Sequence, residues 1–134
     1  MKTFVSASLG LAMLLASAAA YAAEKADVKA NGGVQVIYSF VSSYPNSCNS
    51  ADPPRFKIKQ QAANGRVYAD VVKTTWPATH KKCAGKPVQV FVVAYEPKRG
   101  YRGNDSASVT MSYTLYSNES IRKNRNLRFD INVK

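Results

Sequence analysis

Hydrophobic and polar residues alternate along several short stretches of this chain, with the period of two that is typical of β-strands. The clearest case is residues 107–116, in which apolar side chains alternate with Ser and Thr. Four further stretches alternate in a similar way, namely residues 33–41, 56–61, 66–73 and 127–133. This pattern is typical of antiparallel strands that bury one face and expose the other.

A run of apolar residues on both faces, at 88–95, predicts a central strand. The dipeptide Asn64-Gly65 between two of the alternating stretches predicts a tight hairpin, because both residues tolerate a positive φ. No stretch after the N-terminal segment carries an apolar stripe with helical spacing. The pattern therefore predicts an all-β fold, a small antiparallel sandwich of two sheets.

The N-terminal segment has the three parts of a secretory signal peptide. Lys2 gives it a positive start, residues 4–15 are mostly apolar, and Ala20 and Ala22 suit the positions before a cleavage site. We expect cleavage after Ala22, with a cut after Ala20 as the second choice. An uncleaved anchor is the alternative, but the apolar run is shorter than the roughly 20 residues that span a bilayer.

The chain is therefore expected to comprise a signal peptide at 1–22, a flexible N-terminus at 23–32 and one domain at 33–134, with no transmembrane span. The domain contains the only two cysteines, Cys48 and Cys83. In an oxidising compartment, an even pair of this kind predicts a disulfide, which would stabilise the fold by about 3.8 kcal/mol. A metal or redox pair is the alternative, and it is disfavoured because the chain has no Cys-x-x-Cys spacing and no clustered His.

A corner between two strands is predicted at residues 95–106, where the sequence reads Tyr-Glu-Pro-Lys-Arg-Gly-Tyr-Arg-Gly-Asn-Asp-Ser. Pro fixes φ after a strand, the two glycines permit a positive φ, and the Asp can accept backbone N–H groups. The residues that we expect to build this corner are Tyr95, Pro97, Gly100, Tyr101, Gly103 and Asp105.

The corner resembles the Tyr-x-Pro-x-x-Gly-(Tyr/Phe)-x-Gly-x-Asp-Ser corner of bacterial Ig-like and cadherin-like domains. This resemblance implies an Ig-like sandwich that serves adhesion, envelope architecture or binding, and such a fold hosts many functions. The calcium sites of cadherin-like domains need several carboxylates, and only Asp105 falls within the motif. No metal is therefore expected.

The chain is strongly basic, because 19 Lys and Arg residues against 8 Asp and Glu residues give a net charge of +11. Removal of Lys2 with the signal peptide would leave +10. Such an excess favours anionic partners. For an exported protein these are anionic polysaccharide, lipopolysaccharide phosphate, teichoic acid or an acidic protein rather than nucleic acid. The alternative is that the charge serves solubility only.

Two clusters of basic residues are the candidate binding sites, with Lys98, Arg99 and Arg102 in the corner and Arg122, Lys123, Arg125 and Arg128 around the last connection. Loops gather at the two ends of an Ig-like sandwich, so these residues could converge, together with Lys81, Lys82 and Lys86. Scattered solvated charges are the alternative. Lys57 and Lys59 alternate on a strand and are interpreted as protection of a sheet edge against aggregation.

The sequence contains no catalytic constellation. His80 is the only histidine and lies between other loop residues, the carboxylates are scattered, and there is no glycine-rich phosphate loop. We therefore expect neither an enzyme nor a cofactor.

Two functions agree with these observations. The first is a binding module of the bacterial envelope, periplasmic or secreted, that recognises an anionic glycan or lipid headgroup through basic loops. The alternative is an accessory or inhibitor domain that binds a protein partner through a strand edge or through apolar surface around Phe91, Val93 and Tyr116. No pattern sets an oligomeric state.

Overall fold

A computed structural model describes residues 23–41, 47–49, 54–114 and 122–134 of the chain. The described residues form seven β-strands and no helix. The strands are β1 (Glu24–Val28), β2 (Gln35–Val41), β3 (Arg55–Gln60), β4 (Gly65–Thr75), β5 (Pro87–Pro97), β6 (Gly103–Tyr113) and β7 (Lys123–Val133). The predicted all-β class is confirmed, and β5 is the central strand of its sheet, as its two-sided apolar pattern predicts.

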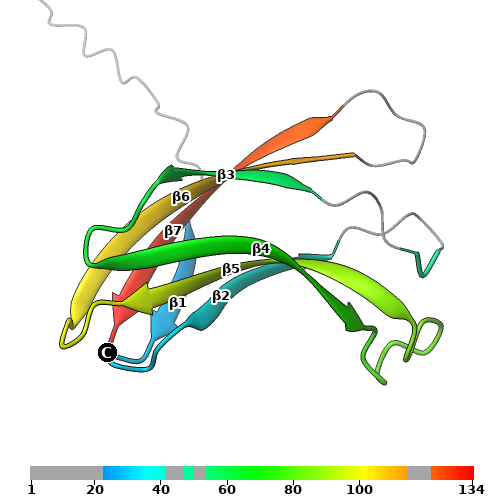
Figure 1. Cartoon of the computed structure of the whole chain (residues 1–134), viewed down its shortest axis with the longest axis horizontal. Coiled ribbons are helices and arrows are strands. Elements are labelled where there is room, and N and C mark those ends of the chain that lie inside the picture. The colour runs from blue at the N-terminus through cyan, green and yellow to red at the C-terminus, as the bar shows by residue number, and fades with distance from the viewer. Residues whose placement is uncertain (1–22, 42–46, 50–53, 115–121) are drawn as a thin grey trace, which may run out of the picture.

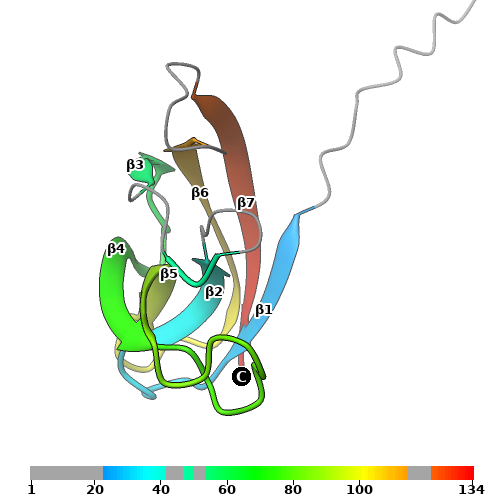
Figure 2. The same cartoon turned by 90° about the vertical axis from the view of Figure 1, so that its right-hand side faces the viewer.

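The strands make two sheets, one with the order β1-β7-β6-β3 and the other with the order β2-β5-β4. Neighbouring strands are antiparallel except for β1, which is parallel to β7. Figure 1 shows that the two layers lie close together at the end that holds the C-terminus. At the other end β6 and β7 diverge from β4 and β5. Figure 2 shows the two layers end on.

The core lies between the sheets and is made of alternate residues of the long strands. On β6 and β7 these are the odd-numbered residues of 107–111 and 127–133, of which Met111 and Phe129 have no exposed surface. Phe91, Val93 and Tyr95 of β5 face them from the other sheet. The alternation at 107–116 and at 127–133 thus predicts the buried face correctly over the residues that the structure describes.

The prediction of a flexible N-terminus at 23–32 is wrong for half of that stretch. Residues 24–28 form β1, which pairs with β7 along its whole length. Val28 at its end is 4% exposed, and its carbonyl accepts the N–H of Lys134. The strand has few apolar residues of its own, so what orders it is a partner strand about 100 residues away in sequence.

The predicted hairpin at Asn64-Gly65 is also wrong. β3 pairs with β6 and β4 pairs with β5, so this connection passes from one sheet to the other. Neither residue has a positive φ. Glycine is needed at position 65 because a Cβ atom would lie 2.6 Å from the ring of Tyr95 and from the carbonyl oxygen of Glu96. Its role is close packing rather than turn conformation.

The corner forms where the sequence predicts it, between the end of β5 and the start of β6. Gly100 and Gly103 have φ values of 79° and 134°, which residues with a side chain rarely adopt. The Tyr101 hydroxyl donates a hydrogen bond to the Asn104 carbonyl across the turn. The backbone N–H of Gly100 donates to the side chain of Asn31, 2.8 Å away, and this bond ties the β1–β2 connection to the corner.

The predicted disulfide joins Cys48 to Cys83. It links the stretch before β3 to the β4–β5 connection, where Trp76 donates its indole N–H to the Cys48 carbonyl at 3.0 Å. Within the described ranges, no helix is long and apolar enough to span a bilayer. The expected signal peptide at 1–22 lies outside the residues that the structure describes.

Candidate functional site

The outer face of the four-stranded sheet is lined by polar side chains. The even-numbered residues of β6 and β7 point away from the core, since most of their odd-numbered neighbours are buried. All ten of these side chains are polar: Asn104, Ser106, Ser108, Thr110, Ser112, Asn124, Asn126, Arg128, Asp130 and Asn132. We call this surface the polar face.

The edge strands extend the polar face on both sides. On β3, Lys57 lies opposite Thr110 and Arg55 lies opposite Ser112. On β1, Lys25 lies opposite Asp130. Directly opposite residues of paired strands point to the same side of a sheet, so these charged side chains join the same surface. The edge strands thereby add three cations to it.

One half of the polar face is cationic, and we call it the basic half. It holds Arg55, Lys57, Arg122 and Arg128, together with the hydroxyl and amide groups between them. The Arg122 guanidinium donates to the Ser112 hydroxyl at 3.0 Å and to its carbonyl at 2.8 Å, so it is held on this side of the sheet. The described residues of these rows include no carboxylate, and Arg128 forms an ion pair with Asp130 of the neighbouring row.

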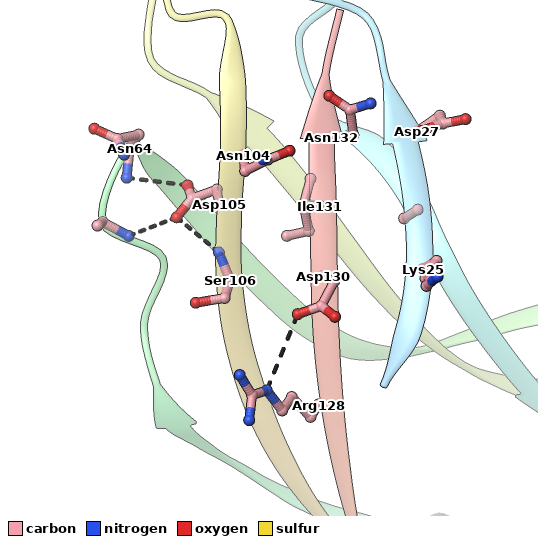
Figure 3. Close-up of a pocket in the computed structure, with 12 residues that line it drawn as sticks. Lys25, Asp27, Asn64, Asn104, Asp105, Ser106, Arg128, Asp130, Ile131 and Asn132 are labelled. Atoms are coloured by element: carbon pink, nitrogen blue, oxygen red, sulfur yellow. Dashed lines mark hydrogen bonds and ion pairs between the residues drawn. The ribbon is translucent and has the colours of Figure 1, made fainter. Parts of the chain in front are cut away.

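The other half is a hollow of about 700 Å³ with mixed charge (Figure 3). Asn104 and Asn132 lie side by side on β6 and β7, and Ser106, Asp130 and Lys25 form the next row. Asp130 and Arg128 both line the hollow and form an ion pair of 4.0 Å, so Arg128 belongs to the hollow as well as to the basic half. Both partners are at least half exposed, so this pair is weak.

Asp105 lines the hollow and ties the two sheets together. Its carboxylate accepts the N–H groups of Ala63 and Asn64 at 3.1 and 3.0 Å and that of Ser106 at 2.9 Å. It also accepts the hydroxyl of Tyr95, a core residue of the other sheet, at 2.8 Å. Burial, reinforced by this bond to a carboxylate, raises the pKa of Tyr95.

Asp105 was expected to bond within the corner, and the structure extends that role to the β3–β4 connection. Its bonds are those of a structural anchor. Four donors of the fold itself, three backbone N–H groups and one hydroxyl, bond to this carboxylate. It is therefore not available for binding or catalysis.

The two predicted basic clusters do not converge. The corner with Lys98, Arg99 and Arg102 follows β5 at the Gly103 end of β6, whereas Arg122 and Lys123 lie at the opposite end. The strands between them are 11 residues long, which separates the clusters by roughly 33 Å. Lys81, Lys82 and Lys86 lie in the β4–β5 connection of the other sheet, at a third position.

The second cluster is itself divided between two surfaces. Arg128 lies on the polar face, but Lys123 and Arg125 pair with Tyr113 and Met111 and so point to the inner side, where the sheets diverge. Arg125 forms an exposed ion pair of 4.0 Å with Glu24. Only Arg122 and Arg128 of the seven predicted binding residues therefore belong to the basic half.

Sequence reasoning missed the contribution of β3. It interpreted Lys57 as protection of a sheet edge and did not include Arg55 among the candidate binding residues. Nothing in the local sequence shows that β3 lies beside β6. The run of Ser and Thr at the polar positions of β6, and of Asn on β7, was the visible indication of an unusual outer face. This pattern could have indicated a binding surface on the strands rather than on the loops.

The apolar surface expected around Phe91 and Val93 is buried, since these two residues are 1% and 0% exposed. Tyr116, the third residue of that hypothesis, lies outside the described residues. Two half-buried apolar residues of β5, Val90 and Val92, lie on its other side. An apolar surface therefore exists on this sheet, but on its outer face.

His80 packs on Trp76, with ring centroids 4.6 Å apart, and its Nδ1 atom accepts the N–H of Cys83 at 3.2 Å. These contacts indicate a structural role for His80 in the disulfide-linked β4–β5 connection. Within the described part of the chain, no group of three or more His, Cys, Asp or Glu side chains could hold a metal ion.

Comparison with known proteins does not add a family to this picture. No protein family, curated protein or solved structure matches the chain. The chemistry of the polar face itself indicates what it can bind. Its guanidinium and ammonium groups can bind anions, and its hydroxyl and amide groups can bind polar partners.

Proposed function

We propose that this protein is a non-enzymatic binding module that recognises an anionic glycan of the cell envelope on its polar face. The observation that carries the proposal is the basic half, where Arg55, Lys57 and Arg128 lie among hydroxyl and amide groups with no carboxylate in the described rows. Arginine binds carboxylate and phosphate groups through two parallel hydrogen bonds. The surrounding Ser, Thr and Asn side chains can bond to sugar hydroxyl groups.

The shape and chemistry of the polar face favour a glycan over a lipid headgroup. A headgroup is attached to acyl chains, and a protein that binds it at a membrane gains from apolar residues beside the charges. The outward side chains of β6 and β7 include no apolar residue. The polar rows run along β6 for 11 residues, or roughly 35 Å, which suits an extended polymer.

We also propose that the domain is Ig-like and exported, to the periplasm or beyond. If the strands are lettered A to G in chain order, the sheets are A-G-F-C and B-E-D. Ig-type sandwiches likewise keep C, F and G in one sheet and B, E and D in the other. The disulfide supports an oxidising compartment.

The test is binding of the purified chain to a polyuronate, to a poly(glycerol phosphate) and to neutral dextran, in low and high salt. The variant Arg55→Ser/Lys57→Ser/Arg128→Ser removes three cations from the polar face. The matched control, Lys98→Ser/Arg99→Ser/Arg102→Ser, removes the same charge from the corner.

We expect the first variant to lose about tenfold or more in affinity for an anionic polymer, if each cation contributes about 0.5 kcal/mol. High salt should weaken binding by screening, and dextran should not bind. The control should bind nearly as well as the parent chain. Equal losses in the two variants, or no binding to either polyanion, would contradict the proposal.

A further inference from the structure

The outer face of the β2-β5-β4 sheet is the opposite of the polar face in chemistry. Its rows, given by the register of the strands, bring together Tyr68, Ala94 and Val36, then Asp70, Val92 and Ser39, then Val72, Val90 and Val41. We call this surface the apolar face. Its apolar members that are half-buried or exposed are Val36, Val41, Tyr68, Val72, Val90 and Val92.

Much of this apolar surface is in contact with solvent. Val36 is 65% exposed, and Val41, Tyr68 and Val72 are each 36–40% exposed. These are four of the six large hydrophobic residues that are exposed among the described residues. Contiguous apolar surface of this kind on a small domain is typical of an interaction site.

The charges around the apolar face fit a second copy of this chain. Arg66, Asp70 and Glu96 are its charged members, so it carries one cation against two carboxylates on a chain of net charge +11. The Arg66 guanidinium lies 5.1 Å from the centre of the Tyr68 ring. Two copies can therefore meet here without bringing their excess positive charge into contact.

In a symmetric dimer, the rows of the two apolar faces match under one orientation of the two-fold axis. A two-fold axis parallel to β5 places β4 of one copy over β2 of the other, without changing the row. Tyr68 then meets Val36, Val72 meets Val41, and Asp70 meets the hydroxyl of Ser39. An axis across the strands would instead set the two Asp70 carboxylates against each other. The first arrangement covers all four exposed apolar residues.

We infer that this protein self-associates through its apolar face, as a symmetric dimer whose two-fold axis runs parallel to β5. The face is about 14 Å wide across three strands and about 20 Å long, so the dimer buries less area than a standard interface. It should therefore be weak and concentration-dependent. Because the net charge of +11 on each copy opposes association, salt should strengthen it.

Sedimentation velocity of the purified chain over a wide concentration range, at about 0.05 M and about 0.5 M NaCl, tests this inference. The variants Val36→Lys and Val72→Lys place a charge in the dimer interface. The control Thr79→Lys adds the same charge on the exposed β4–β5 connection. We expect the parent chain and the control to dimerise with increasing concentration, more readily at high salt, and each interface variant to require at least tenfold more protein.

A cysteine experiment tests the symmetry separately. Mixing Val41→Cys with Val72→Cys under mild oxidation should link the two variants to each other, whereas Val72→Cys alone should link poorly. A chain that stays monomeric in every condition, or a dimer that survives both lysine substitutions, would overturn the inference. Neither outcome depends on glycan binding, which the monomer performs on its other face.

Discussion

The outer face of the β1-β7-β6-β3 sheet and the outer face of the β2-β5-β4 sheet lie on opposite sides of one sandwich and differ in chemistry. Ser, Thr, Asn and cations cover the first, whereas valines and a tyrosine cover much of the second. The inner faces, by contrast, are alike and supply residues such as Phe91 and Phe129 to one core.

The comparison separates what the fold needs from what the surface does. A sheet in a two-layer sandwich is stable with one solvated polar face, so the fold does not require valines at positions 36 and 72. Nor does it require a cationic outer face at Arg55 and Lys57. We explain the difference between the faces by the two partners proposed above, a polyanion on one side and a second copy on the other. A dimer of this kind would present two glycan-binding faces in opposite directions and could join two polymer strands.

The largest effect is expected from Asp105→Ala. This substitution removes the hydrogen bonds that join the two sheets, on which both outer faces depend. It leaves the Tyr95 hydroxyl and the N–H groups of Ala63 and Asn64 without their acceptor in a partly or fully buried place. We expect a loss of about 3–5 kcal/mol in the free energy of unfolding. Urea denaturation measures this loss, and Asn104→Ala, at the exposed neighbouring position, should change stability by less than about 0.5 kcal/mol.

A charge reversal should separate the functions of the two faces. Arg55→Glu/Lys57→Glu reverses two cations of the basic half, and we expect it to lower the affinity for an anionic glycan more than tenfold, through like-charge repulsion. Val72→Lys, on the apolar face, should leave that affinity unchanged or slightly higher. Calorimetric titration with a polyuronate compares the two, and a similar loss in both variants would show that the faces do not act independently.

The hydroxyl of Tyr95 joins the two sheets and should make stability depend on alkaline pH. Since its pKa is raised in the fold above the ordinary value of 10.0, the stability from its bond to Asp105 is present below pH 10 and falls as the pH rises above it. At neutral pH we expect Tyr95→Phe to cost about 1–2 kcal/mol.

Urea denaturation of the parent chain and of Tyr95→Phe, at neutral and at alkaline pH, measures this dependence. The difference between the two proteins should shrink above pH 10, because the Tyr95 hydroxyl ionises more readily in the unfolded parent chain than in the fold, whereas the variant lacks this group. A difference that stays constant with pH would mean that the hydroxyl contributes through packing alone.

The smallest effects should come from exchanging isosteric residues between the faces. Val72→Thr and Thr110→Val change one side chain each, at positions that point outward from their sheets. We expect each to alter the free energy of unfolding by less than about 0.5 kcal/mol. Val72→Thr should nevertheless weaken the dimer. A large loss of stability in Val72→Thr would mean that the valines serve the fold after all.

Local patterns predicted much of the fold. The alternation at 107–116 and 127–133, the two-sided apolar run of β5, the corner glycines and the cysteine pair depend on neighbouring residues or on a simple count. The features that were predicted wrongly depend on distant partners. β1 is ordered by β7, and Gly65 is needed because the Tyr95 ring packs against it.

The candidate site was predicted only in part for the same reason. Arg122 and Arg128, two of the predicted binding residues, lie on the basic half, but Arg55 and Lys57 join them only because β3 pairs with β6, about 50 residues away. Loops were expected to gather the cations. The 11-residue strands instead hold the corner and the last connection at opposite ends.

The most direct test of the central claim is a titration of the isotope-labelled chain with a short oligouronate, followed through its backbone amide NMR signals. We expect the largest changes on β3, β6 and β7, around Lys57, Thr110 and Asn126, with little change at the corner or on β5. Changes that centre on Lys98 and Arg102, or that are absent at saturating ligand, would contradict a glycan site on the polar face.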